Sequence, residues 1–144
     1  MAGRRFRIVI DTNVLIAASR STAGASAAIV VALGDGAFDA AVSKKLILEY
    51  EEVLRREIEG VFLSADDVTR FVDFMAAKAR HVEPTSLLRP VLDDPDDDFV
   101  LELAFAARVD YVVTHNVRDF RAAASYGVRA ITPGAFLQLL RGQS

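Results

Sequence analysis

Short apolar runs alternate with longer amphipathic stretches along most of this chain. The runs that favour strands lie at residues 5–10, 38–42, 111–114 and 128–132, with a shorter one at 81–84. The stretches between them favour helices, because apolar residues recur at intervals of three or four, as at positions 68, 71, 72 and 75. Strands that alternate with helices predict a parallel sheet covered on both faces. We therefore expect an α/β protein, a three-layer α/β/α sandwich with a central, mostly parallel sheet.

Capping residues indicate where several of the helices begin. Ser43 is an N-cap candidate for a helix from Lys44, and Ser64 or Asp66 caps the helix that follows. Prolines open the last two helices, where a missing N–H costs nothing. The expected helices span residues 14–18, 25–33, 44–59, 63–79 and 95–108, and the last begins at residue 133.

Composition narrows the class of protein. With 144 residues, 52% of them hydrophobic, we expect one folded domain over residues 1–144, with a core over 7–140, and not a disordered chain. The chain has no cysteine, which excludes disulfides, cysteine-ligated zinc and thiol catalysis, and fits a reducing cytoplasm. Its longest uncharged run has 14 residues, too short for a membrane span, and Asp11 interrupts the apolar start too early for a signal peptide. We expect a cytoplasmic protein with no membrane partner.

Two acidic residues follow predicted strands. Asp11 comes directly after the first strand, and Asp119 lies a few residues after the strand at 111–114. In parallel sheets ligands bind beyond the carboxyl ends of the strands, so both residues are candidates for a site there. Asp11 has a second interpretation as the N-cap of the following helix, and the sequence does not choose between the two.

Glu49 lies at the rim of an apolar helix face formed by residues 46, 50, 53 and 54. This position allows its side chain to reach a cleft, whereas Glu52 points further away. The competing interpretation is a surface ion pair with Lys45 or Arg56, which is the commoner fate of such a residue.

The segment "VLDDPDDDFVLELAFAA" places five aspartates before a nearly wholly apolar helix. Asp94 and Asp97 fall on one line of that helix, and Asp98 and Glu102 fall on another, away from the expected site. N-capping and a favourable interaction with the helix dipole would account for the presence of Asp94 and one further acid. They do not account for five aspartates, because repulsion among the carboxylates should cancel the stabilisation that the additional ones give. An EF-hand calcium loop is excluded, because its glycine and glutamate positions hold phenylalanine.

The remaining polar residues at this edge lie in "VVTHNVRDF". Thr114 and Asn116 are small hydrogen-bonding residues that can hold a water molecule or a phosphate oxygen, whereas His115 is expected to be solvated or hydrogen-bonded.

A site of carboxylates without cysteine or paired histidines suits Mg²⁺ or Mn²⁺, and such sites most often serve phosphoryl transfer or phosphodiester hydrolysis. The net charge of −3 argues only weakly against a nucleic-acid partner, because bound cations raise the local potential. No glycine-rich phosphate loop follows the first strand, which argues against a Rossmann or P-loop enzyme.

Taken together, these segments resemble the PIN domain, in the branch of VapC-like toxins of bacterial toxin–antitoxin pairs. The matching segments are "IVIDTNVLI" with Asp11, "SKKLILEYEEVL" with Glu49, "DPDDDFVLELA" with Asp94 and Asp97, "YVVTHNVRDF" with Asn116 and Asp119, and "ITPGAFLQLL". The resemblance implies a Mg²⁺- or Mn²⁺-dependent endoribonuclease that cleaves single-stranded RNA, a frequent homodimer, and a small antitoxin protein as partner.

The resemblance also implies roles for individual residues. Asp11 and Asp97 would hold the principal metal, and Asp94, Glu49 and Asp119 would complete or extend the site. Asn116 departs from the family pattern, in which many members have an acid at this position.

Two other functions remain to be weighed. A degenerate PIN fold that binds RNA or a protein without cleavage is the alternative function, although four retained acids argue against it. A receiver-like signalling domain is strongly disfavoured, because the chain lacks its acidic pair near the first strand and its lysine after the last strands.

Basic residues must contact the RNA backbone around an acidic pocket. Arg118 and Arg121 are the strongest candidates, since they flank Asp119. The pairs Lys44–Lys45 and Arg55–Arg56 are further candidates.

Overall fold

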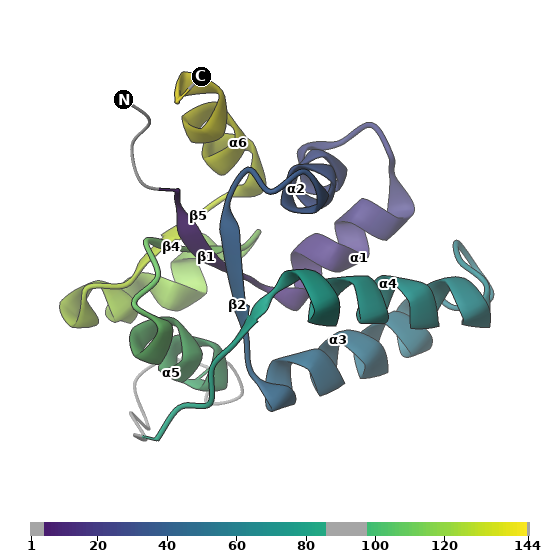
Figure 1. Cartoon of the computed structure of the whole chain (residues 1–144), viewed down its shortest axis with the longest axis horizontal. Helices are drawn as coiled ribbons and strands as arrows, with labels where there is room; N and C mark the ends of the chain where they lie inside the picture. The colour runs from purple at the N-terminus through teal and green to yellow at the C-terminus, as the bar shows by residue number, and fades with distance from the viewer. Residues whose placement is uncertain (1–4, 86–97, 144) are drawn as a thin grey trace.

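A five-stranded, all-parallel sheet forms the centre of the molecule in the computed structural model, which describes residues 5–85 and 98–143 (Figure 1). The strands are β1 (Arg7–Ile10), β2 (Asp39–Val42), β3 (Arg80–His81), β4 (Tyr111–Val113) and β5 (Arg129–Ile131). Their order in the sheet is β3-β2-β1-β4-β5, so the first strand of the sequence is also the central one. The expected sheet is therefore confirmed, and every strand pair in it is parallel.

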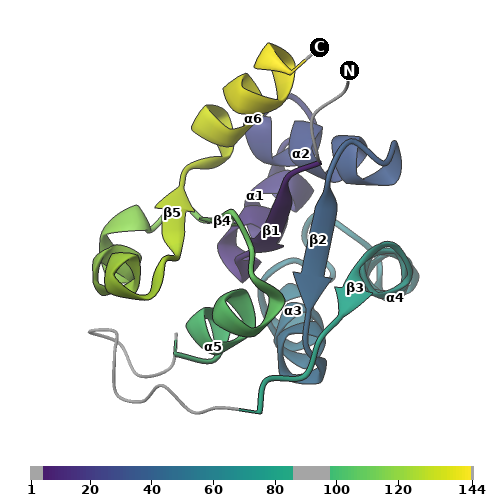
Figure 2. The same ribbon diagram turned by 60° about the vertical axis from the view of Figure 1, so that its left-hand side comes forward.

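Helices flank the sheet on both faces, as predicted. They are α1 (Thr12–Arg20), α2 (Ala25–Gly34), α3 (Lys44–Glu57), α4 (Ala65–Lys78), α5 (Asp98–Ala107) and α6 (Pro133–Gly142), with a 3-10 helix, η2 (Val117–Tyr126). Helix α1 packs against α2 and α3, and α2 also packs against α6. Helix α5 packs on β1 and β2 and contacts η2, on the other side of the sheet from α1 (Figure 2).

Most predicted elements are present within a few residues of their expected limits. Ser43 and Ser64 are N-caps, each accepting a hydrogen bond from the backbone three residues on, and Pro133 opens α6 after the cap Thr132. The expected start of the fifth helix at Pro95 lies outside the described residues, which begin again at Asp98. The sequence analysis assigned no element to "VRDFRAAASY", which forms η2 with Phe120 and Ala123 as its buried residues. None of the described helices is both long and apolar enough to cross a bilayer by itself, although α1 and α2 pass that test jointly across a 104° bend.

The central strand is fixed to α3 by a buried tyrosine. Strand β1 is fully buried from Ile8 to Ile10, and the Tyr50 side chain on α3 is fully buried as well. The Tyr50 hydroxyl donates a hydrogen bond to the carbonyl oxygen of Ile10. Because Asp11 follows Ile10 and Glu49 precedes Tyr50, this bond holds the two acidic residues at a set separation.

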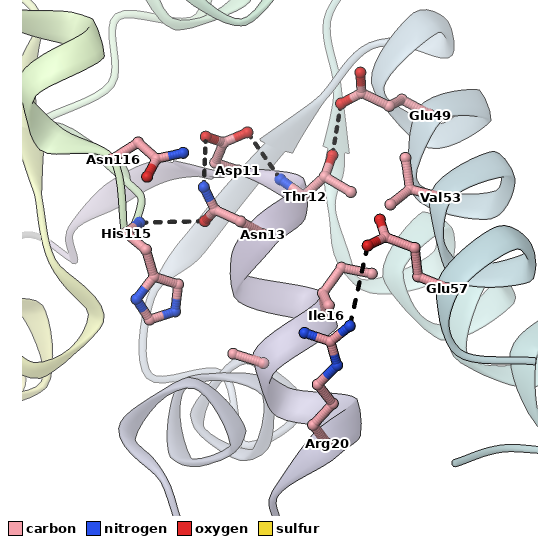
Figure 3. A pocket seen from close by; sticks show the side chains of 11 residues that line it. Asp11, Thr12, Asn13, Ile16, Arg20, Glu49, Val53, Glu57, His115 and Asn116 are labelled. Carbon is pink, nitrogen blue, oxygen red and sulfur yellow. Dashed lines mark hydrogen bonds and ion pairs between the residues drawn. The ribbon is translucent and has the colours of Figure 1, made fainter. Parts of the chain in front are cut away.

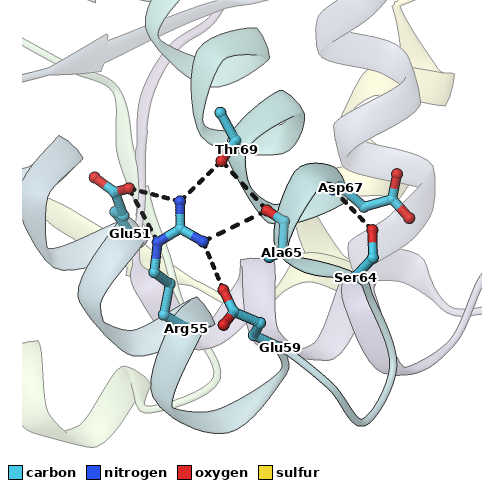
Figure 4. Close-up of polar contacts among 7 residues, drawn as sticks. All are labelled: Glu51, Arg55, Glu59, Ser64, Ala65, Asp67 and Thr69. Carbon is cyan, nitrogen blue, oxygen red and sulfur yellow. Dashed lines mark hydrogen bonds and ion pairs between the residues drawn. The ribbon is translucent and has the colours of Figure 1, made fainter.

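Helices α3 and α4 are joined by the guanidinium group of Arg55 (Figure 4). It donates to Glu51 at 2.9 Å and to Glu59 at 2.6 Å, and it reaches Thr69 of α4 at 2.8 Å. A guanidinium engaged in this way holds two helices together, so Arg55 is a structural residue here and not a free contact for RNA.

We predict that Tyr50→Phe lowers the free energy of unfolding by about 1 kcal/mol, because the ring still fills its space while the hydrogen bond is lost. Urea titrations at constant pH measure the change. Tyr126→Phe is the matched control, since this tyrosine is 40% exposed and its ring contact with Phe105 does not need the hydroxyl. Equal stability of the two variants would show that the bond to Ile10 contributes nothing.

Candidate active site

A pocket of about 620 Å³ opens at the carboxyl edge of the sheet, between α1, α3 and the loop after β4 (Figure 3). Asp11 and Glu49 both line it, although 38 positions separate them in the sequence. Asn116 lines the same pocket from the side of β4. Three of the predicted site residues are thus brought together from three elements.

Asp11 is both the N-cap of α1 and a pocket carboxylate, so the two interpretations of this residue are compatible. It is 7% exposed, and its Oδ1 accepts from the backbone N–H of Thr12 at 2.9 Å. Its Oδ2 accepts from the hydroxyl of Thr114 at 2.8 Å. Burial raises the pKa of Asp11, and the charge of Asp119 raises it further, while the two hydrogen bonds and His115 lower it.

Asn13 connects the two sides of this edge. Its amide nitrogen donates to Asp11 Oδ2 at 3.3 Å and to the hydroxyl oxygen of Thr114 at 3.2 Å. Its side-chain oxygen accepts from the backbone N–H of His115 at 3.2 Å. Thr114 is fully buried and also accepts from the backbone N–H of Asn116 at 3.0 Å. This network of neutral donors orients the Asp11 carboxylate without neutralising it.

Glu49 points toward α1 instead of pairing with a basic side chain. Its Oε2 accepts from the hydroxyl of Thr12 at 2.6 Å. The alternative partners are engaged elsewhere, because Arg56 lies 3.7 Å from Glu52 and the Lys45 ammonium lies 4.7 Å from the ring centre of Phe99. Burial raises the pKa of Glu49, the hydrogen bond from Thr12 lowers it, and the charge of Asp11 raises it again.

The other predicted acids have different placements. Asp119 lies in the first turn of η2 and acts on Asp11 through its charge, but it does not line the pocket. Asp94 and Asp97 lie outside the described residues. Asp98 and Glu102 are buried, have interaction partners, and do not line the pocket of Asp11. Within residues 5–85 and 98–143, no three acidic or histidine side chains are close enough to hold one metal ion.

Arg118 and Arg121 line a second cavity of about 390 Å³, along η2 and β5. Arg129 of β5 lines it too, and its floor includes Phe120 and Val128. In the described part of the chain, none of these three arginines has an ion pair or a side-chain hydrogen bond. The two cavities adjoin in sequence, since Asn116 lines the first and Val117 lines the second.

Sequence reasoning missed the residues that hold the carboxylates in place. Thr12 and Asn13 are two polar residues directly before the apolar run 14–18 of helix α1, and that contrast was a usable signal. Arg20 and Glu57, at the far end of the pocket, carried no such signal, because the sequence does not show that α1 and α3 lie side by side.

We predict that Glu49→Gln stabilises the metal-free protein at pH 8. With its pKa raised above the ordinary value of 4.5, ionised Glu49 destabilises the folded state, and this cost disappears as the pH falls to 4.5 and below. Glutamine keeps an acceptor for Thr12 but carries no charge. Thermal melts in EDTA should therefore show a higher melting temperature than the wild type at pH 8 and a difference near zero at pH 4.

Asp73→Asn is the control for this experiment, because that carboxylate is exposed on the neighbouring helix α4 and is not among the charges that shift the pKa of Glu49. A stabilisation by Glu49→Gln that increases on acidification would contradict the proposed effect of burial.

Comparison with known proteins agrees with this geometry. A family model described as the PIN domain matches residues 7–118, which is more than half of the chain. No curated protein matches the sequence of this chain. The matched region includes β1 with Asp11, α3 with Glu49 and β4 with Thr114 and Asn116. The chain therefore belongs to the PIN domain family, whose members are generally metal-dependent nucleases.

Proposed function

We propose that this protein is a Mg²⁺- or Mn²⁺-dependent endoribonuclease that hydrolyses single-stranded RNA, as in the VapC-like toxins that its sequence resembles. The observation that carries the proposal is the pair of carboxylates, Asp11 and Glu49, in one pocket. Asp11 is buried there, and no lysine or arginine of the described residues forms an ion pair with it. A buried carboxylate without a basic partner is a favourable place for a cation.

The chemistry of these donors fits a hard divalent cation, because both are carboxylate oxygens. Asp11 and Glu49 would hold the ion from the described part of the chain, and Asp119 would add negative charge from η2. Asp94 and Asp97 would supply the remaining donors. Such an ion lowers the pKa of a bound water and balances charge on the scissile phosphate.

The side chains around the carboxylates orient them for this role. Thr114 and Asn13 fix one Asp11 oxygen through hydrogen bonds of 2.8 and 3.3 Å, and the backbone N–H of Thr12 fixes the other. The hydroxyl of Thr12 holds Glu49 toward the same pocket. Partners that orient the ligands of a metal typically affect affinity 10- to 100-fold. Asn116 adds a neutral amide to the lining of the pocket.

The biological setting is part of the same proposal. A VapC-like nuclease acts in the cytoplasm, forms a homodimer and is neutralised by a small antitoxin protein. We extend these properties to this chain on its resemblance to that branch alone.

We expect the wild-type protein to cleave a labelled single-stranded RNA of mixed sequence when Mn²⁺ is added and not in EDTA. Asp11→Asn should lower the rate by more than about 100-fold, because losing a ligand should exceed the loss of an orienting partner. Mn²⁺ should also raise the melting temperature of the wild type, by an amount equivalent to about 2.7 kcal/mol at a hundredfold excess over Kd, and leave Asp11→Asn nearly unchanged.

Asp66→Asn is the matched control, since Asp66 is an exposed acid in the first turn of α4. Wild-type protein that binds RNA but neither cleaves it nor responds to Mn²⁺ would support the alternative function, a PIN fold that only binds.

We further predict that Arg118→Glu with Arg121→Glu weakens RNA binding without changing Mn²⁺ binding measured by calorimetry. For every phosphate that the protein no longer neutralises, the dependence of log affinity on log salt should become flatter by about 0.7. Arg70→Glu with Lys78→Glu reverses two charges on α4, away from both cavities, and is the control. Unchanged RNA affinity would place the RNA backbone elsewhere, and loss of Mn²⁺ binding would mean that the arginines stabilise the site itself.

A further inference from the structure

We propose that the far end of the Asp11 pocket is a base-binding subsite that prefers guanine, read by Arg20 and Glu57. This inference rests on the proposed function, because it takes single-stranded RNA as the ligand. It adds a specificity determinant that neither the acid cluster nor the cavity of Arg118 and Arg121 provides.

The pocket is elongated along α1 and has different chemistry at its two ends (Figure 3). Asp11 caps the start of α1, and Arg20 is its last residue, so nine residues at 1.5 Å each separate them by about 13 Å. The intervening wall is apolar, with Ile16 on α1 facing Val53 on α3, and Ala17 of α1 also lines the pocket. A base from a strand held at the acidic end can therefore lie against aliphatic side chains before its edge meets Arg20.

Arg20 and Glu57 face each other across this end from α1 and α3. Their closest atoms, Nη2 of Arg20 and Oε1 of Glu57, are 4.0 Å apart, which is too long for a hydrogen bond. The other carboxylate oxygen of Glu57, Oε2, lies 3.6 Å from Arg56. About half of the Arg20 side chain is exposed, and it donates no side-chain hydrogen bond within the described residues. Neither the Arg20 nor the Glu57 side chain makes a hydrogen bond within the described residues, so both can form hydrogen bonds with a ligand while their ion-pair contacts remain.

The charge of this end favours a base over a phosphate. Arg20 and Glu57 together are neutral, and the charge of Arg56 beside Glu57 is balanced by Glu52, which lies 3.7 Å from Arg56. Glu49 lies further along the same pocket. A phosphate at Arg20 would face the repulsion of Glu57, whereas a neutral base edge would not. Unstacked RNA bases are commonly recognised by hydrogen bonds to their Watson–Crick and Hoogsteen edges.

Guanine matches this pair better than the other bases. Its O6 and N7 accept from a guanidinium group, which is the commonest specific contact of arginine with a base. Its N1–H and N2–H lie next to O6 and donate to a carboxylate. Guanine alone presents an adjacent pair of acceptors and an adjacent pair of donors, so only guanine engages Arg20 and Glu57 in pairs at once.

The four nucleosides test this subsite without phosphate, metal or cleavage. We expect saturation-transfer NMR to show that guanosine binds the intact protein at least roughly 5-fold more tightly than adenosine, cytidine or uridine, which is the lower limit for one good bidentate contact. Arg20→Gln and Glu57→Gln should each remove this preference. Arg70→Gln is the matched control, because Arg70 is an exposed arginine on α4 with a partner in Asp67.

Cleavage adds a second readout and separates this inference from the proposed function. RNAs with a single guanosine in a uridine background should be cut at a position set by the guanosine, and Arg20→Gln should spread the cuts while keeping the Mn²⁺ response. Cleavage without any base preference, or equal binding of the four nucleosides, would overturn the subsite and leave the nuclease intact. A uniform loss of RNA affinity in Arg20→Gln, with a salt dependence flatter by about 0.7, would assign Arg20 to a phosphate and also overturn it.

Discussion

The rest of the site depends on one buried charge, the carboxylate of Asp11 at the end of the central strand. Hydrogen bonds from Thr12, Thr114 and Asn13 hold it, and none of these donors carries a positive charge. Burial therefore raises the pKa of Asp11, and it also makes a neighbouring carboxylate costly. Glu49 is nevertheless held beside it, by Thr12 and by the bond from Tyr50 to Ile10. The fold keeps two repelling groups together, and a cation is the simplest way to relieve that repulsion.

The two cavities have complementary electrostatics. The first contains the carboxylates, and the second is bordered by three arginines that lack acidic partners in the described ranges. The RNA substrate that we propose would be repelled by the first and attracted by the second, so steering and chemistry would fall to adjacent parts of the surface. Arg55 differs from these three arginines, because its charge is balanced by Glu51 and Glu59. Its role is therefore to join helices α3 and α4.

Much of the fold and part of the site could be predicted from the sequence. Asp11 was predictable, because an acid directly after a buried strand has a defined place in a parallel sheet. For Glu49 the helical period gave the direction of the side chain, but not its partner, since that depends on where Thr12 lies in the folded protein. The pairing of Arg20 with Glu57 and the path of η2 were out of reach for the same reason. Both features depend on how the helices pack against one another, and the spacing of apolar residues within one helix does not determine that packing.

The order of strands has a consequence for how this protein is made. The hydroxyl of Thr114 donates a hydrogen bond to Asp11, which lies 103 positions earlier in the sequence. The two residues meet because strand β1 pairs with strand β4, which is synthesised much later. A nascent chain that stops before residue 114 has its central strand bordered on one side only, and its acid is not yet caged. The site assembles through distant contacts, which form slowly. A site built in this way is complete only after the chain has been synthesised through residue 114, so no shorter nascent chain holds Asp11 by this bond.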